Sequence, residues 1–309
     1  MFDPEAANIP FQGFAALPRC PDGSVCLLTT GQAEINAAST LSSLLHSRVF
    51  DLTSTYFLVA GIAGVNPKIA TIGAVTFAKY AVQPCAFDRV FPLGATAPGQ
   101  LAGSWDGTEV FEVNDAFRQK AFALAKTAAL NDTVEAQQAR ALYSNSSSFP
   151  AGAAHPRVVL CDTATSDTFW NGDLLGQMVE NTTRVLTNGF AEYCTTQQED
   201  NATLNALLRG ALSYRVDFAR DAAAHLLNPT PGFAPSLRNL RFAGVKVVQG
   251  IVSDGTPRLR RASRRRTTSG TYSDRWAGSP TFAPGTTEGT GLAIQNPDRA
   301  GGYDLTITQ

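Results

Sequence analysis

The segment from Tyr56 to Pro67, Tyr-Phe-Leu-Val-Ala-Gly-Ile-Ala-Gly-Val-Asn-Pro, constrains the fold of this chain most. Its β-branched and aromatic first half predicts a buried strand over residues 56–60. The two glycines that follow predict a loop made of Gly61, Ile62, Ala63 and Gly64. Ligands of open α/β sheets bind at the carboxyl ends of strands, where glycines let the backbone approach them. The segment therefore predicts either a ligand-binding loop or a tight turn that binds nothing.

Strand and helix patterns alternate along the rest of the chain. Helices are expected over residues 32–47, 115–143 with a break near Asn131-Asp132, 172–187 and 201–227, the last being the longest. Further strands are expected over residues 25–30, 73–83, 109–113, 158–161 and 245–251. This alternation predicts an α/β fold with helices on both faces of a central sheet.

Composition and charge restrict the class of protein. A chain of 309 residues that is 44% hydrophobic can build one large core, which we place in residues 1–252. Residues 253–309 are rich in Ser, Thr, Gly and Arg, with a basic run over residues 258–266, and we expect them to be a solvated, largely disordered tail. A net charge of −1 gives no general attraction to nucleic acid. No segment contains the roughly 20 mainly apolar residues that a membrane-spanning helix needs.

Five cysteines and four glycosylation sequons bear on the compartment. Cys20 and Cys26 flank a Pro-Asp-Gly turn that a disulfide could close, and Cys161 could pair with Cys194, which leaves Cys85 free. Five buried thiols are the alternative. The sequons begin at Asn131, Asn145, Asn181 and Asn201 and fit a secreted protein. The opening residues, Met1 to Ala6, do not show a signal-peptide pattern, so we expect none within this sequence.

Four segments in a fixed order, residues 26–38, 56–67, 157–170 and 197–204, resemble the fungal purine nucleoside permease family. That family is similar to the nucleoside phosphorylase and nucleosidase superfamily. The resemblance implies a three-layer αβα sandwich of the nucleoside phosphorylase type around a mixed sheet, and a secreted or cell-surface location. In the family the opening hexapeptide of this chain usually follows an apolar strand, so we expect a leader and the first strand to be missing here.

The resemblance also assigns roles around a purine nucleoside. Glu199 would bind the ribose hydroxyls, with Gln198 beside the sugar or base. Alternatively, Glu199 is a first-turn carboxylate that interacts with the helix dipole. Phe169 and Trp170 would stack on the purine, or else belong to the core. Asp167 would bind the base edge or cap the helix that begins near residue 172.

Two further positions are implied less directly. Glu5 resembles the glutamate that activates the attacking water, with Asp3 as the alternative. Asn36 and Glu34 lie at a helix entry, where Asn36 is expected to be structural.

The chain departs from the family after Arg220, where a segment carrying the proton-donating aspartate is missing. His225 could replace that acid because its ordinary pKa is near neutrality, or it could be a surface or capping residue on a helix. We therefore expect a purine nucleosidase or phosphorylase that uses no metal or organic cofactor, with phosphate as co-substrate in the second case. A nucleoside-binding component of transport, catalytically impaired, is the alternative. A homo-oligomer is compatible with either hypothesis.

Overall fold

The structure, a computed structural model, describes residues 28–47, 50–84, 107–227 and 232–253. Its helices are α2 (Glu34–His46), α3 (Asp115–Ala125), α4 (Val134–Ala141), α5 (Asp173–Leu186), α6 (Asp200–Leu212) and α7 (Phe233–Ser253), with a 3-10 turn, η1, at Phe218–Arg220. Its strands are β1 (Phe57–Val65), β2 (Val75–Ala78), β3 (Tyr80–Val82), β4 (Val110–Glu112), β5 (Val158–Leu160), β6 (Asp162–Thr165), β7 (Tyr193–Gln197) and β8 (Asp221–Leu227).

One mixed sheet joins the eight strands in the order β4-β3-β6-β7-β1-β8-β2-β5. β1 lies parallel to β8 over residues 57–63, but pairs with antiparallel β7 only at Gly64 and Val65. Within the described part of the chain, the edge of β1 opposite β8 therefore has no strand partner over residues 57–63. β1 is consequently only partly buried, whereas all four residues of β2 are buried.

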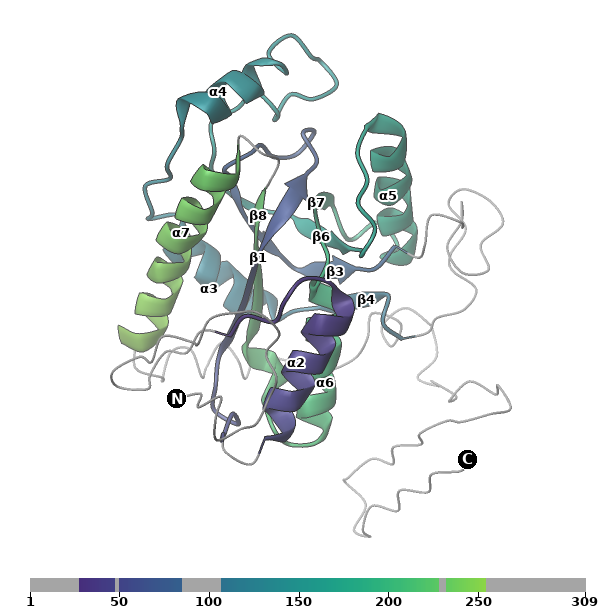
Figure 1. The fold of residues 1–309 in the computed structure, drawn as a ribbon, viewed down its shortest axis with the longest axis vertical. Coiled ribbons are helices and arrows are strands. Elements are labelled where there is room, and N and C mark those ends of the chain that lie inside the picture. The colour runs from purple at the N-terminus through teal and green to yellow at the C-terminus, as the bar shows by residue number, and fades with distance from the viewer. Residues whose placement is uncertain (1–27, 48–49, 85–106, 228–231, 254–309) are drawn as a thin grey trace, which may run out of the picture.

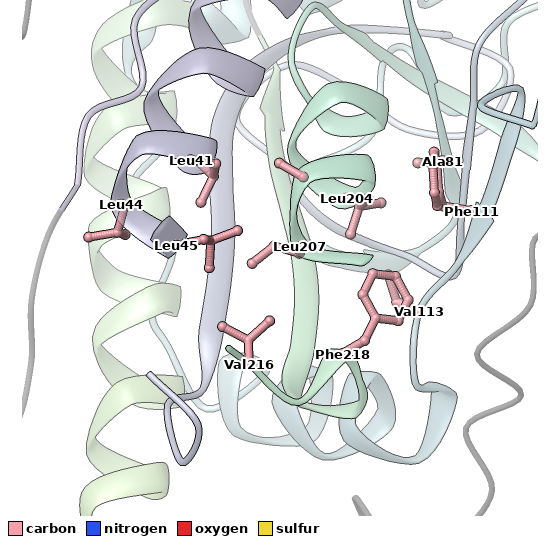
Figure 2. Close-up of a cluster of buried hydrophobic side chains, with 11 residues drawn as sticks. Leu41, Leu44, Leu45, Ala81, Phe111, Val113, Leu204, Leu207, Val216 and Phe218 are labelled. Carbon is pink, nitrogen blue, oxygen red and sulfur yellow. The ribbon is translucent and has the colours of Figure 1, made fainter. Parts of the chain in front are cut away.

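Helices cover both faces of this sheet, which confirms the expected α/β class. Figure 1 shows α3 beside α7, and α2 beside α6 in another part of the molecule. Leucines of α2 and α6 form one core with Phe111 and Phe218 (Figure 2). Phe77 of β2 packs in a second core with alanines of α3 and α7. Phe57 contacts the first core and Leu58 the second, because successive strand residues point to opposite faces.

The local boundaries of several elements follow from the sequence. α2, α5, β2, β3 and β4 lie where they were expected. The expected helical region over 115–143 is broken into α3 and α4, and Asn114 and Thr133 cap the two helices by accepting hydrogen bonds from Phe117 N and Ala136 N.

The prediction of a glycine loop at residues 61–64 is wrong. β1 continues through Gly61 and Gly64 and ends at Val65, just before Asn66-Pro67. Neither glycine has a positive φ. The glycines instead lie where β1 exchanges its pairing with β8 for pairing with β7, so sheet pairing has overridden the local turn signal.

The chain after residue 212 also differs from expectation. The helix expected over 201–227 ends at Leu212, and the alanine-rich residues 221–227 form β8 between β1 and β2. The strand expected over 245–251 is instead part of α7, where Ala243 and Val247 are buried four residues apart. Leu28 to Thr30, expected to end a strand, are not in one.

The predicted pairing of Cys161 with Cys194 is confirmed. The disulfide joins the chain between β5 and β6 to β7, and both cysteines are buried. Asn66 N donates to Cys194 O at 2.7 Å, which ties the end of β1 to the same place. The predictions for Asp3, Glu5, Cys20, Cys26, Cys85 and residues 254–309 lie outside the described residues.

Candidate functional site

A large cavity runs along β1 and ends at the amino terminus of α6. Its volume is 2190 Å³, above the 300–1,000 Å³ of most small-ligand sites. It follows β1, whose edge opposite β8 has no strand partner over residues 57–63 among the described residues. Many of the predicted site residues line this β1 cavity: Gly61, Ile62, Ala63, Gly64, Phe169, Trp170, Gln198 and Glu199. Segments distant in sequence thus meet at one place.

Glu199 occupies the N-cap position of α6, but its carboxylate does not cap that helix. Glu199 Oε1 accepts a hydrogen bond from Ala33 N at 3.0 Å, and Oε2 accepts one from Gln198 N at 3.1 Å. The carboxylate therefore turns toward the amino terminus of α2. This geometry differs from the alternative in which the Glu199 carboxylate interacts with the dipole of α6, the helix that Glu199 precedes.

Gln197, which the sequence analysis did not single out, holds the start of α6. Gln197 Oε1 accepts from Glu199 N at 2.7 Å and from Asp200 N at 2.8 Å. Its Nε2 donates to Thr165 Oγ1 at 2.6 Å. The side chain is 3% exposed, so this network is fixed inside the protein. Its signal in the sequence is weak, because Thr-Thr-Gln reads as a polar loop rather than a buried strand.

Asp167 and Gln198 connect the same two helices. Asp167 Oδ1 accepts from Glu34 N at 3.0 Å, so Asp167 caps α2 rather than α5. Gln198 Nε2 donates to Asp167 O at 3.0 Å, and Gln32 Nε2 donates to Gln198 Oε1 at 2.7 Å. Asp167 is exposed and is not among the described residues that line the β1 cavity. Carboxylates thus accept from the first backbone N–H groups of α2, where the helix dipole favours negative charge.

The backbone before α2 adopts conformations that L-residues rarely take. Gly31 has φ +86°, and a Cβ added there would lie 3.1 Å from Asn36 Cβ. Ala33 has φ 77° and ψ 162°, a region occupied almost only by glycine. Asn36 Nδ2 donates to Gln32 O at 2.6 Å, which agrees with its expected structural role. Hydrogen bonds on both sides therefore hold a strained turn next to Glu199.

Glu34 brings a third carboxylate to this turn. Burial raises the pKa of Glu34 above its ordinary value, and the negative charges of Asp167 and Glu199 raise it further. Both Glu34 oxygens accept from Gln83 Nε2 at 2.8 Å, which opposes the increase in pKa. Glu34 consequently binds its proton more tightly in the folded protein than in the unfolded chain.

The two predicted aromatic residues differ in their surroundings. Phe169 is 80% exposed at the β1 cavity. Trp170 is partly buried and packs against the cluster of Val179 and Tyr193. Trp170 therefore belongs in part to the core, whereas most of the Phe169 side chain is exposed at the cavity.

The structure changes the interpretation of His225. It lies in β8, opposite Gly61 of β1 and Thr76 of β2, and not on a helix. The α-helix expectation failed because the Ala-rich run has high helix propensity but pairs with strands on both sides.

Two features are absent from residues 28–47, 50–84, 107–227 and 232–253, which the structure describes. No three His, Cys, Asp or Glu side chains there gather closely enough to bind a metal ion. Among the same residues, no helix combines the length and apolar character needed to cross a membrane.

The sequence comparisons all match this chain to the same protein family. A family model described as purine nucleoside permease (NUP) matches residues 4–223. The chain is 39% identical over 266 residues to a purine nucleoside permease of Candida albicans, covering 75% of this chain and 64% of that protein. It is 35% identical over 271 residues to a probable purine nucleoside permease of Schizosaccharomyces pombe, covering 74% and 76%. The chain thus spans less than two thirds of the Candida relative's length.

Solved structures with a similar chain path are nucleosidases. A putative methylthioadenosine nucleosidase from Weissella paramesenteroides matches with a TM-score of 0.42 and 14% identity, over 73% of this chain and 78% of that one. A 5'-methylthioadenosine/S-adenosylhomocysteine nucleosidase from Colwellia psychrerythraea, in complex with adenine, matches with a TM-score of 0.44 and 14% identity, over 72% and 76%. The sequence matches are much the stronger of the two and determine the family.

Proposed function

We propose that this chain, which belongs to the purine nucleoside permease family, binds purine nucleosides in the β1 cavity and cleaves their N-glycosidic bond. The position of Glu199 carries the proposal. Its carboxylate is held by two backbone N–H groups at a cavity that also contains an exposed aromatic ring, Phe169.

The chemistry of glycosidic cleavage fits this arrangement. The sugar becomes positively charged as the bond to the base breaks, and a fixed carboxylate beside it stabilises that charge. A carboxylate can accept about four hydrogen bonds, so Glu199 can bind ribose hydroxyls in addition to the two backbone groups. Stacking of a base on an aromatic ring such as Phe169 contributes about 1–3 kcal/mol. These residues would therefore bind the sugar and the purine at adjoining positions.

A second candidate is a nucleoside-binding component of transport that does not cleave its ligand. The names of the two fungal relatives suggest it. The segment after Arg220 that carries the family's proton-donating aspartate is also missing from this chain, which favours binding without cleavage.

Product analysis distinguishes these functions. The purified full chain is incubated with inosine or adenosine, with and without phosphate. Free base formed without phosphate identifies a hydrolase, and ribose 1-phosphate identifies a phosphorylase. Saturable binding without turnover supports the second candidate and contradicts the first. If the chain neither binds nor cleaves any purine nucleoside, both candidate functions are overturned.

We also propose that the chain acts outside the cytosol, in a secreted or cell-surface location. The family resemblance and the disulfide between Cys161 and Cys194 support this location, since disulfides persist mainly in oxidising compartments. Homo-oligomer formation stays a prediction.

A further inference from the structure

The four sequons of the chain differ sharply in their structural surroundings. Each has the Asn-x-Ser/Thr pattern that accepts an N-linked glycan, and they begin at Asn131, Asn145, Asn181 and Asn201. A folded protein can carry a glycan only where the asparagine side chain reaches solvent. The structure therefore indicates which of the four positions are compatible with the modification.

Two sequons are incompatible with a glycan in the folded chain. Asn201 is 1% exposed, and its Nδ2 donates to Thr108 O at 2.6 Å while its Oδ1 accepts from Thr165 Oγ1 at 2.7 Å. Asn131 Oδ1 is buried, and Asn131 N and O both bond the side chain of Asn239. A glycan on Asn201 would displace its side-chain contacts, and one on Asn131 would have to extend from a side chain whose oxygen is buried.

The third sequon is only partly accessible. Asn181 is exposed on α5, but the hydroxyl residue of its sequon, Thr183, is 1% exposed. The folded chain therefore buries the hydroxyl residue of this sequon, while the asparagine itself reaches solvent.

The fourth sequon meets every requirement. Asn145 and Ser147 are both exposed in the connection between α4 and β5. The neighbouring Leu142 is 85% exposed, so a hydrophilic glycan at Asn145 would cover apolar surface that otherwise faces water. This position also lies next to Tyr143, which lines the β1 cavity.

We infer that Asn145 carries an N-linked glycan and that Asn131 and Asn201 do not. The inference rests on the proposed extracytosolic location and is independent of the proposed nucleoside chemistry. In the transfer, the Asn145 carboxamide nitrogen loses a proton and forms a C–N bond to the anomeric carbon of a lipid diphosphate-linked oligosaccharide. The anomeric C–O bond breaks, and the lipid diphosphate leaves.

Isotope labelling of the natural protein tests the inference. The full chain is purified from the cells that naturally produce it and deglycosylated by an amidase in ¹⁸O water, which converts each glycosylated Asn to labelled Asp. Peptide mass spectrometry should find the label at Asn145 and none at Asn131 or Asn201. Unlabelled Asn145, or label at Asn131 or Asn201, would overturn the inference.

A matched pair of variants separates the sequon from the loop. Ser147→Ala removes the hydroxyl that the sequon requires and should lose one glycan's mass, while Ser148→Ala, one residue further on, should keep it. Both variants should retain the nucleoside binding or turnover of the parent chain. Equal glycan mass in the two variants would contradict the assignment to Asn145. If a variant loses nucleoside binding or turnover but keeps its glycans, the result concerns the proposed nucleoside function and does not affect the assignment of the glycan to Asn145.

Discussion

At the scale of single residues, the turn before α2 holds strain next to the proposed site. Ala33 lies at φ 77° and ψ 162°, and its N–H bonds Glu199. A non-glycine residue in such a conformation costs about 1–3 kcal/mol and persists where surrounding contacts fix it. Tertiary contacts, which a local sequence pattern does not contain, therefore determine this turn.

The strain at Ala33 can be measured by relieving it. Ala33→Gly should raise the free energy of unfolding by about 1 kcal/mol, since the relief of strain exceeds the entropy cost of glycine. Urea denaturation measures the change. Ala38→Gly, within α2, is the matched control and should lower the free energy of unfolding by about 1 kcal/mol. Lower stability of both variants would show that Ala33 is not strained.

The carboxyl of Glu34 predicts a pH dependence. Burial, and then the charges of Asp167 and Glu199, raise its pKa on folding above 4.5. The folded state therefore retains this proton better, and the stabilisation is fully present below pH 4.5 and lost as pH rises through the folded pKa. Glu34→Gln should thus gain stability relative to the parent chain between pH 4 and pH 7, as followed by urea denaturation. An equal difference at both pH values would contradict this sign.

At the scale of elements, Gln197 joins the end of β7 to the start of α6. It satisfies two N–H groups of α6 and donates to Thr165, all within the protein. Removing a buried partner leaves these groups unsatisfied, at about 1–3 kcal/mol for each. Gln197→Leu should therefore lower the free energy of unfolding by about 3 kcal/mol in chemical denaturation. Gln119→Leu, on the exposed face of α3, should change it by less than about 0.5 kcal/mol. Similar effects of the two changes would remove Gln197 from this role.

The elements also show how far the sequence predicts the fold. Helical spacing predicts α2 and α5, and the break near Asn131-Asp132 separates α3 from α4, because those signals are local. β7 and β6 were not predicted as such: their threonines and Gln197 look polar, yet they bond one another inside the sheet. Residues 221–227 were assigned to a helix because pairing with β1 and β2 involves residues far away in the chain. The same long-range pairing keeps Gly61 and Gly64 in a strand.

Only part of the site could be predicted from the sequence, because its residues lie far apart in the chain. Its members come from three segments, and only the family resemblance connected them before the structure placed eight predicted residues at the β1 cavity. Gln197 and the role of Asp167 as the cap of α2 required coordinates, because neither follows from spacing.

At the scale of the whole molecule, the disulfide connects β7 to the chain between β5 and β6. It spans 33 residues of sequence, so its loss should lower the free energy of unfolding by roughly 3–4 kcal/mol. The double variant Cys161→Ala with Cys194→Ala, compared with the oxidised parent in urea, measures this. Thiol counting on unreduced, denatured protein is the control and should find three reactive thiols at most. Five reactive thiols, or an unchanged denaturation midpoint, would contradict the disulfide.

The most direct test of nucleoside cleavage at the β1 cavity is the turnover of Glu199→Gln. Glutamine keeps the shape of Glu199, and its one oxygen can accept one of the two backbone hydrogen bonds, but it removes the charge that would stabilise the sugar cation. We predict that kcat and kcat/KM for inosine or adenosine both fall by about 10²-fold, corresponding to roughly 3 kcal/mol, while nucleoside binding changes much less. Glu192→Gln, on an exposed residue at the start of β7, should leave both constants unchanged. Undiminished turnover of Glu199→Gln would contradict the assignment of Glu199 to the site.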